Sequence, residues 1–156
     1  MGRDSVGFET AYRIAATICG AMAASTVLYA LVVAVISVSQ APFEGFAPGF
    51  QPSILRVTLW TLAIVDAGLI GLARRSLLAR SRSEGAAGQA RRLITTAVVT
   101  AALAEAPAIL GLVLFMLSGL HGDFYALLAL SLALQAVYFP RLGGWREWAV
   151  EPASGC

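Results

Sequence analysis

The chain alternates between long apolar runs and short polar stretches, and this pattern predicts helices that cross a membrane. A helix needs about 20 apolar residues to span the hydrocarbon core of a bilayer. Four runs approach that length, and we expect helices at about residues 12–39, 54–73, 93–119 and 124–140. Too little sequence remains for a soluble domain. Residues 1–156 should therefore form a single all-α membrane domain, a bundle of four transmembrane helices.

The composition agrees with this interpretation and excludes several other classes of protein. Apolar residues make up 58% of the chain and charged residues 13%, whereas soluble domains are about 25% charged. One histidine and two cysteines are too few for a bis-histidine haem, a Cys/His zinc site or a multi-disulfide scaffold, so we expect no metal and no cofactor. A net charge of +2 is too small to indicate nucleic-acid binding.

The distribution of arginine predicts the orientation of the helices. The chain contains no lysine, and ten of its 11 basic residues fall on one side of the predicted membrane. These ten are Arg3, Arg13, Arg74, Arg75, Arg80, Arg82, Arg91, Arg92, Arg141 and Arg146. Because cytoplasmic loops collect positive charge, we expect both termini, the loop 74–92 and the short tail 141–156 to be cytoplasmic. The protein would then be a multi-pass protein of the cell (inner) membrane.

The connections on the opposite side have a different character. Residues 40–53 are rich in proline, glycine and phenylalanine, which predicts a loop in the headgroup region, with a lid or partner-docking loop as the alternative. A tight turn over residues 118–123 contains His121 and Asp123. We interpret His121 as an exposed bystander, with proton collection as the alternative, and Trp60 as an interfacial anchor.

Two carboxylic acids lie near the middle of predicted helices: Asp66 in the second and Glu105 in the third. An ionised carboxylate in hydrocarbon costs several kcal/mol, so each acid must be protonated, paired or in contact with water. The two acids, on neighbouring antiparallel helices, can share a proton or cation, or face different partners. In the alternative interpretation each acid only bonds across a helix interface. Gln135 in the fourth helix has the same two interpretations: a cross-helix hydrogen bond, or part of an ion path.

The third helix carries a patterned surface around its acid. Small residues recur at intervals of three and four, a spacing that lets another helix approach closely. They are Ala97, Ala101, Ala104, Ala108 and Gly111. Pro107 cannot donate to the carbonyl of Leu103, so we expect a kink and a free carbonyl oxygen within a turn of Glu105. This carbonyl and Thr100 are possible auxiliary ligands of an ion.

Around Glu105 the sequence resembles the proteolipid c subunit of rotary (F-type/V-type) ATPases. In that family a Thr-Thr pair precedes an Ala-Leu-x-Glu core, and a Gly-Leu-Val stretch follows; here these are Thr95-Thr96, Ala102-Leu103-Ala104-Glu105 and Gly111-Leu112-Val113. The resemblance covers roughly residues 79–118 and implies a hairpin in which Glu105 is the ion-binding acid. The partner helix has Asp66, Gly68 and Gly71 in place of a run of alternating glycines, so we expect a c-like hairpin flanked by two further helices.

These observations favour an integral membrane subunit that binds or translocates protons or cations. Glu105 would be the exchangeable carboxyl and Asp66 its coupled partner, with Thr100 and Gln135 as auxiliary residues. The alternative is a non-transporting structural subunit that stabilises a larger membrane complex. We expect no enzymatic activity, because no nucleophile–base pair or phosphate-binding loop is present in the sequence. The expected partners are the lipid bilayer and other membrane subunits, or further copies of the chain.

Overall fold

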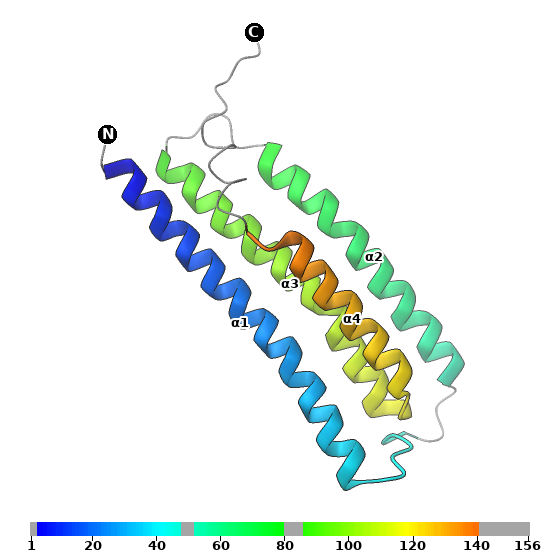
Figure 1. Ribbon diagram of the computed structural model, residues 1–156. Helices are drawn as coiled ribbons and strands as arrows, with labels where there is room; N and C mark the ends of the chain where they lie inside the picture. The colour runs from blue at the N-terminus through cyan, green and yellow to red at the C-terminus, as the bar shows by residue number, and fades with distance from the viewer. Residues whose placement is uncertain (1–2, 48–51, 80–85, 141–156) are drawn as a thin grey trace.

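The described residues form four helices that run alternately in opposite directions (Figure 1). The computed structural model describes residues 3–47, 52–79 and 86–140. Its helices are α1 (Arg3–Ser39), α2 (Pro52–Ala79), α3 (Ala86–Ser118) and α4 (His121–Tyr138). The start of α1, the end of α2 and the start of α3 lie at one end of the bundle. We call this end, which carries most of the described arginines, the arginine end, and the other the distal end. The predicted all-α class and the number of helices are confirmed.

Three of the four helices are long and apolar enough to cross a membrane. The candidate spans are Glu9–Ser39, Ser53–Leu77 and Ala90–Ser118. At about 1.5 Å per residue, the 18 residues of α4 extend about 27 Å, slightly less than the hydrocarbon core. This helix also carries His121, Asp123 and Gln135, and it is not among the candidate spans. The protein is thus a multi-pass helical membrane protein with three long apolar spans.

The predicted loop 74–92 is wrong over most of its length. Helix α2 continues to Ala79 and α3 begins at Ala86, so four of the six arginines in this stretch lie on helices. Arginine, leucine and alanine are strong helix formers, and helical hydrogen bonding continues past the point where the apolar run stops. In the same way α1 begins at Arg3 and not near residue 12. The remaining loop residues 80–85 and the predicted tail 141–156 lie outside the described residues.

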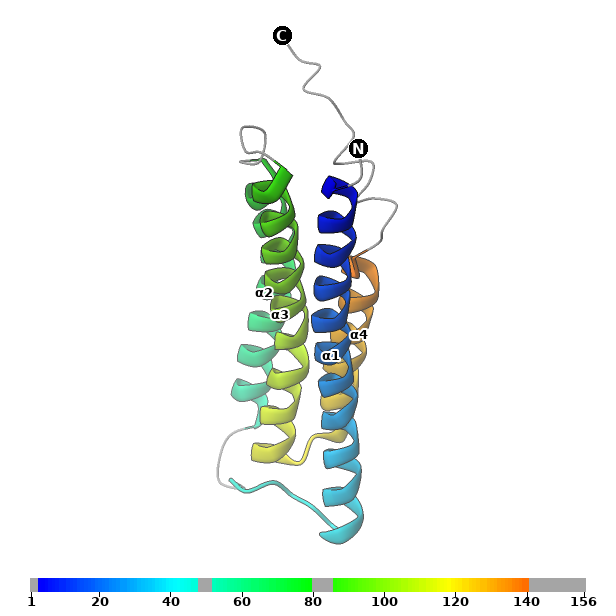
Figure 2. The ribbon, with the colours of Figure 1, turned by 90° about the vertical axis from the view of Figure 1, so that its left-hand side faces the viewer.

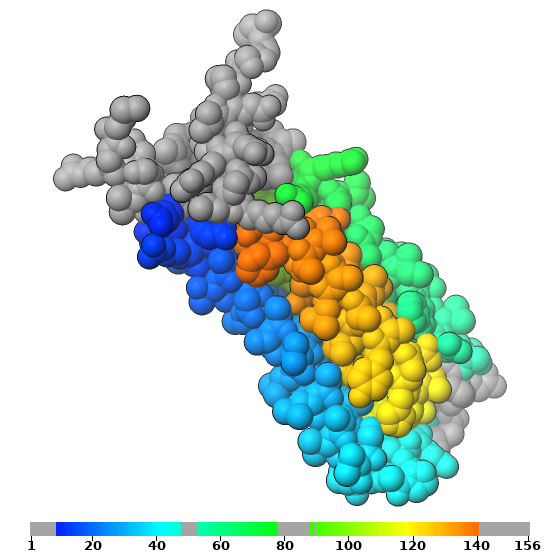
Figure 3. Space-filling view, in the orientation of Figure 1, coloured from blue at the N-terminus to red at the C-terminus, as the bar shows by residue number. Residues whose placement is uncertain are grey.

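Helix α3 packs against each of the other three helices, and Figure 2 shows it between α2 and α1 in the view. Helix α4 lies over α3, between α1 and α2, as the space-filling view in Figure 3 shows. The small residues of α3 permit this close approach. A Cβ atom added at Gly111 would lie 3.0 Å from the Leu127 Cβ and 3.3 Å from the Phe124 carbonyl oxygen. The small-residue surface of α3 therefore seats α4 at this point, as expected of helix packing in membranes.

The main apolar core lies in the distal half of the bundle. Buried residues of α1, α3 and α4 form it: Val33, Ala108, Phe115, Phe124 and Leu128. The described part of the connection between α1 and α2 packs against this core. The backbone N–H of Phe46 donates to the Met116 carbonyl at 2.8 Å, and the Phe43 ring lies 5.0 Å from the Phe115 ring. Residues 40–47 thus cover the distal end of α3, whereas residues 48–51 lie outside the described part of the chain.

Two glycines with positive φ angles allow this connection to lie directly on the end of α3. Gly45 has φ 88° and Gly119 has φ 67°, a backbone conformation that other residues rarely adopt. A Cβ at Gly45 would clash with the Leu117 carbonyl oxygen, and one at Gly119 would lie 2.6 Å from the Phe43 carbonyl oxygen. Both positions therefore need glycine for conformation and for space.

Candidate functional site

Glu105 accepts two hydrogen bonds from α1 in the interior of the bundle. The Ser25 hydroxyl donates to Glu105 Oε1 at 2.6 Å, and the Tyr29 hydroxyl donates to the same oxygen at 2.7 Å. Ser25 and Tyr29 are four residues apart, so they share one face of α1 and both reach α3. Glu105 is 9% exposed. In the sequence, Tyr29 carries no signal of this role except its helical spacing from Ser25.

The Ser25 hydroxyl links the carboxyl to the backbone of α1. Its oxygen lies 2.7 Å from the Met22 carbonyl and 2.6 Å from Glu105 Oε1, yet a hydroxyl carries a single proton. If Glu105 is ionised, the Ser25 proton points to the carboxylate. If Glu105 is protonated, the carboxyl can donate to Ser25, and Ser25 can then donate to Met22. Both protonation states of Glu105 therefore find hydrogen-bond partners in the same arrangement of atoms.

Asp66 lies on α2, on a different helix from the hydrogen-bond donors of Glu105. Its neighbours along the packed face of α2, Ala63 and Ile70, are buried. The Oδ2 atom of Asp66 is buried and has no hydrogen-bond partner among the described residues. Because the hydrogen bonds described for Glu105 come from Ser25 and Tyr29, the two carboxyls do not bond directly to each other.

The predicted auxiliary residues occupy two different environments. Thr100 is 3% exposed, and its Oγ1 has no hydrogen-bond partner within the described part of the chain, so it does not contact Glu105 through this atom. Gln135 Nε2 donates to Thr26 Oγ1 on α1 at 2.8 Å and to Ser131 Oγ at 3.3 Å. Gln135 therefore forms a cross-helix hydrogen bond, the first of its two predicted roles.

A chain of polar groups connects Gln135 with the surroundings of Glu105. Thr26 Oγ1 donates to the Met22 carbonyl at 3.1 Å, and Ser25 Oγ lies 2.7 Å from the same carbonyl oxygen. On the other side, Ser131 donates to the carbonyl of Ala104, the residue before Glu105, at 2.7 Å. Polar side chains of α1 and α4 thus surround the segment of α3 that carries the acid, and α3 continues as a helix through Pro107.

A small cavity lies beside this chain of polar groups. It has a volume of about 10 Å³ and is lined by residues that include Cys19, Ala101, Ala104, Gln135 and Tyr138. The Oε1 atom of Gln135 is buried and has no hydrogen-bond partner among the described residues. A cavity of this size is near the lower limit for one water molecule, which would satisfy that atom.

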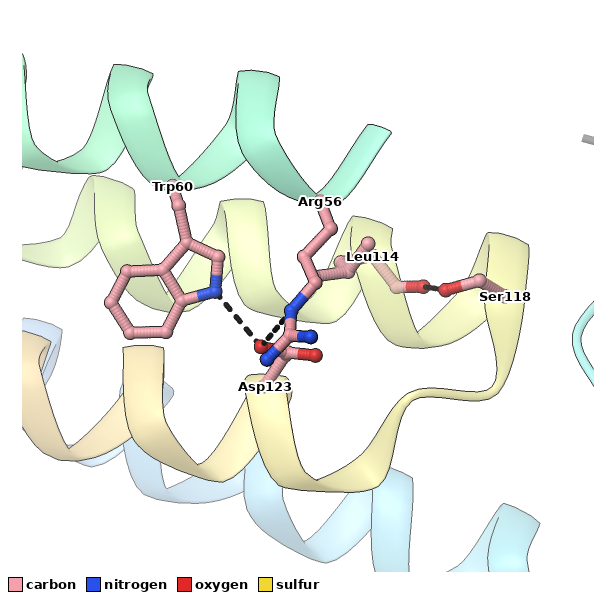
Figure 4. A network of polar contacts seen from close by, with 5 residues as sticks. All are labelled: Arg56, Trp60, Leu114, Ser118 and Asp123. Atoms are coloured by element: carbon pink, nitrogen blue, oxygen red, sulfur yellow. Dashed lines mark hydrogen bonds and ion pairs between the residues drawn. The ribbon is translucent and has the colours of Figure 1, made fainter. Parts of the chain in front are cut away.

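A second polar cluster lies at the distal end, between α2 and α4 (Figure 4). Arg56 Nε and Trp60 Nε1 both donate to Asp123 Oδ1 at 2.9 Å. Asp123 belongs to the first turn of α4, where a carboxylate also interacts favourably with the helix dipole. Next to it in Figure 4, the Ser118 hydroxyl donates to the Leu114 carbonyl within α3 at 2.7 Å.

Contacts at the distal end change three expectations from the sequence. Trp60 hydrogen-bonds Asp123, in addition to any role as an interfacial anchor. Asp123 is a helical, buried residue and does not lie in an exposed turn. His121, although exposed, lies 2.8 Å through Nε2 from Ser37 Oγ, and its ring packs edge-on against Phe115 at 4.9 Å. The sequence missed these contacts because each joins residues more than 60 positions apart or on different helices.

Replacing Asp123 with asparagine is expected to destabilise the contact between α2 and α4 by about 1 kcal/mol. Asparagine keeps an acceptor for Trp60 but loses the ion pair with Arg56, whose side chain is 59% exposed, so solvent weakens the pair. A double-mutant cycle with Arg56→Gln, measured by reversible unfolding in detergent micelles, should give a coupling of about 0.5 kcal/mol. Additive effects of the two substitutions would contradict this assignment.

The described residues contain no group of three or more His, Cys, Asp or Glu side chains that could hold a metal ion. Comparison of the chain with protein-family models, with curated proteins and with solved structures finds no match. The geometry of the site is therefore the basis for proposing a function.

Proposed function

We propose that this membrane protein binds a proton or small cation reversibly at Glu105. The observation that carries the proposal is a carboxyl buried in the central candidate span and held by two hydroxyl groups of a neighbouring helix. Carboxylates are costly in hydrocarbon, and those that occur there commonly serve proton or ion pathways. The proposal agrees with the c-subunit resemblance around Glu105, in which this position is the ion-binding acid.

The neighbours of Glu105 favour a proton over a metal cation. Ser25 and Tyr29 approach Oε1 as hydroxyl donors, which suits an ionised carboxylate. The Met22 carbonyl gives the Ser25 proton a second acceptor, so the neutral carboxyl is also accommodated. A cation would instead need several oxygen atoms that direct lone pairs at it. In the proposed function Asp66 is a second carboxyl, on α2, that acts without a direct hydrogen bond to Glu105.

The proposed topology follows from the arginine distribution. With the arginine end in the cytoplasm, both termini are cytoplasmic, and α4 completes the passage across the cell membrane together with the three candidate spans. Glu105 then lies within the hydrocarbon region, and a proton must reach it from one side of the membrane or the other.

Labelling with a hydrophobic carbodiimide tests the proposal, because this reagent reacts with protonated carboxyls in apolar surroundings. We expect the purified protein in detergent to acquire one adduct at Glu105, identified by mass spectrometry of its peptides. Labelling should fall at least about tenfold between acidic and alkaline pH, as the carboxyl ionises. Sodium at low-millimolar concentration should leave labelling unchanged if the site takes a proton, and should block it if the site takes this cation.

Two variants serve as controls for this experiment. Glu105→Gln removes the reactive group while keeping an acceptor for Ser25 and Tyr29, so labelling should be lost and the fold retained. Asp66→Asn should leave the adduct at Glu105 in place. An unlabelled Glu105 in the folded protein, or labelling that does not change with pH, would contradict the proposal.

The network of hydrogen bonds across three helices supports a second function, that of a non-transporting structural subunit. Ser25, Tyr29, Thr26, Gln135 and Ser131 join α1, α3 and α4, and such bonds stabilise helix packing without any titration. If the protein has this second function, Glu105→Gln would leave intact both the assembly of the larger complex and the activity of that complex. Unlabelled Glu105 together with that result would favour the structural subunit.

A further inference from the structure

A pocket near the arginine end lies between the end of α2 and the start of α3. Its volume is about 580 Å³, within the range of ligand-binding pockets. It is lined by Ser76, Leu77, Gly88, Arg91, Arg92, Thr95 and Thr96. None of these residues belongs to the Glu105 site, so the pocket needs an explanation of its own.

The lining residues of α3 recur at helical spacing, which places them along one side of the helix. Gly88, Arg92 and Thr96 are each four residues apart, and Arg91 and Thr95 form a second row with the same spacing. Gly88 adds no side chain, and it belongs to the first turn of α3, where backbone N–H groups lack intrahelical acceptors. Two arginines and the first turn of α3 therefore border one space.

Thr96 supplies an independent indication that something binds in this pocket. Its side chain is 6% exposed, lines the pocket, and has a buried Oγ1 atom without a hydrogen-bond partner among the described residues. A buried hydroxyl without a partner is unfavourable, so such a group is normally satisfied by a protein atom, a ligand or water. By contrast, the hydroxyls of Ser76 and Thr95 donate to carbonyls of their own helices.

The position of the pocket indicates the kind of ligand. Leu77 ends one candidate span, and Arg91 and Arg92 come directly after Ala90, which begins another. The pocket thus lies at the level of the lipid headgroups, with Leu77 on its lining for an apolar group. Guanidinium groups bind phosphate oxygens through paired N–H donors, and basic pockets between membrane helices take anionic lipid headgroups.

We infer that this pocket binds the phosphate group of an anionic phospholipid, held by Arg91, Arg92 and the hydroxyl of Thr96. The same chemistry would accept free phosphate, and the experiment separates these two sources. The site is independent of Glu105, so the failure of either proposal leaves the other standing.

Binding is measured by native mass spectrometry of the protein in a neutral detergent, with phosphatidylglycerol, phosphatidylcholine or inorganic phosphate added in separate arms. We expect one phosphatidylglycerol to bind at least about tenfold more tightly than phosphatidylcholine, and Arg91→Gln to reduce this preference several-fold. Binding of inorganic phosphate with the same dependence on Arg91 would support the phosphate site and name the soluble source. Equal binding of the two lipids, with no binding of phosphate, would overturn the inference.

Two further variants separate a built site from general surface charge. Thr96→Val keeps the shape of a side chain whose hydroxyl makes no hydrogen bond to any described residue, so the fold should persist while binding weakens several-fold. Arg75→Gln removes an exposed arginine of α2 that is not among the lining residues, and it should leave binding unchanged. Equal losses for Arg75→Gln and Arg91→Gln, or no loss for Thr96→Val, would overturn the assigned site.

Discussion

Replacing Gly111 with leucine is expected to separate α4 from α3 and to destabilise the protein by about 3 kcal/mol or more. The first added atom, Cβ, would already lie 3.0 Å from the Leu127 Cβ and 3.3 Å from the Phe124 carbonyl oxygen. A backbone carbonyl cannot move aside as a flexible side chain can, so the helices themselves must shift. The shift would also disturb the Ser131 bond to Ala104, which depends on the same helix contact.

The matched control is Gly68→Leu, because nothing lies within 4 Å of a Cβ built at Gly68. Leucine has a better helix propensity than glycine by up to about 1 kcal/mol, so this variant should be neutral or slightly more stable. Both variants can be compared by unfolding in detergent micelles. Equal stability of the two would show that α4 does not pack on α3 through Gly111.

Replacing Phe115 with alanine is expected to cost about 3–5 kcal/mol, the second large effect. The Phe115 side chain is fully buried, and its ring lies against Phe43 at 5.0 Å, His121 at 4.9 Å and Phe124 at 6.1 Å. Alanine would leave a cavity that borders the α1–α2 connection as well as α4. We expect the unfolding transition to occur at a lower concentration of denaturing detergent.

Phe46→Ala is the control for this prediction, since Phe46 is 67% exposed and its ring contacts Phe43 edge-on at 5.3 Å. This variant should lose less than about 1 kcal/mol, as substitutions of exposed residues usually do. A loss at Phe115 no greater than at Phe46 would mean that the distal aromatic cluster does not hold the bundle together. Glu105 should remain reactive to carbodiimide in the control variant.

The two proposed sites lie at different depths along the helices. Glu105, Ser25 and Tyr29 form a closed hydrogen-bonded group between α1 and α3, suited to the gain and loss of a proton. Arg91 and Thr96 lie nearer the arginine end, facing a pocket between α2 and α3. Because the two sites share no residue, lipid binding at one can be tested without altering the other.

The sequence singles out Glu105 and Asp66 alike, since both stand alone in apolar runs, but their surroundings in the structure differ. Glu105 has two hydroxyl partners, whereas the buried Oδ2 of Asp66 has none among the described residues. The hydrogen-bond partners of Glu105 could not be predicted because they lie far from it along the chain. Ser25 and Tyr29 precede Glu105 by 80 and 76 residues, and no local pattern specifies that α1 and α3 meet at these positions.

For the arginines, the sequence misled about local structure. Their place along the chain predicted a loop over residues 74–92, where most of the residues are helical. Hydropathy measures how favourably a segment transfers into a bilayer. Helix formation depends instead on local backbone hydrogen bonds, which continue in water. Only the extended helices bring Ser76 and Leu77 beside Arg91, Arg92 and Thr96 to form a pocket.

The sequence by itself determined that the chain is an all-helical membrane protein, where its apolar spans lie, and that it carries two acids within them. These properties follow from local quantities: the apolar content of about 20 consecutive residues and hydrogen bonds between residues four apart. The tertiary structure decided that α3 is central, that Glu105 faces α1, and that Asp123 pairs with Arg56. Such pairings depend on which helix faces fit closely together, and this is settled by packing between distant segments at places such as Gly111.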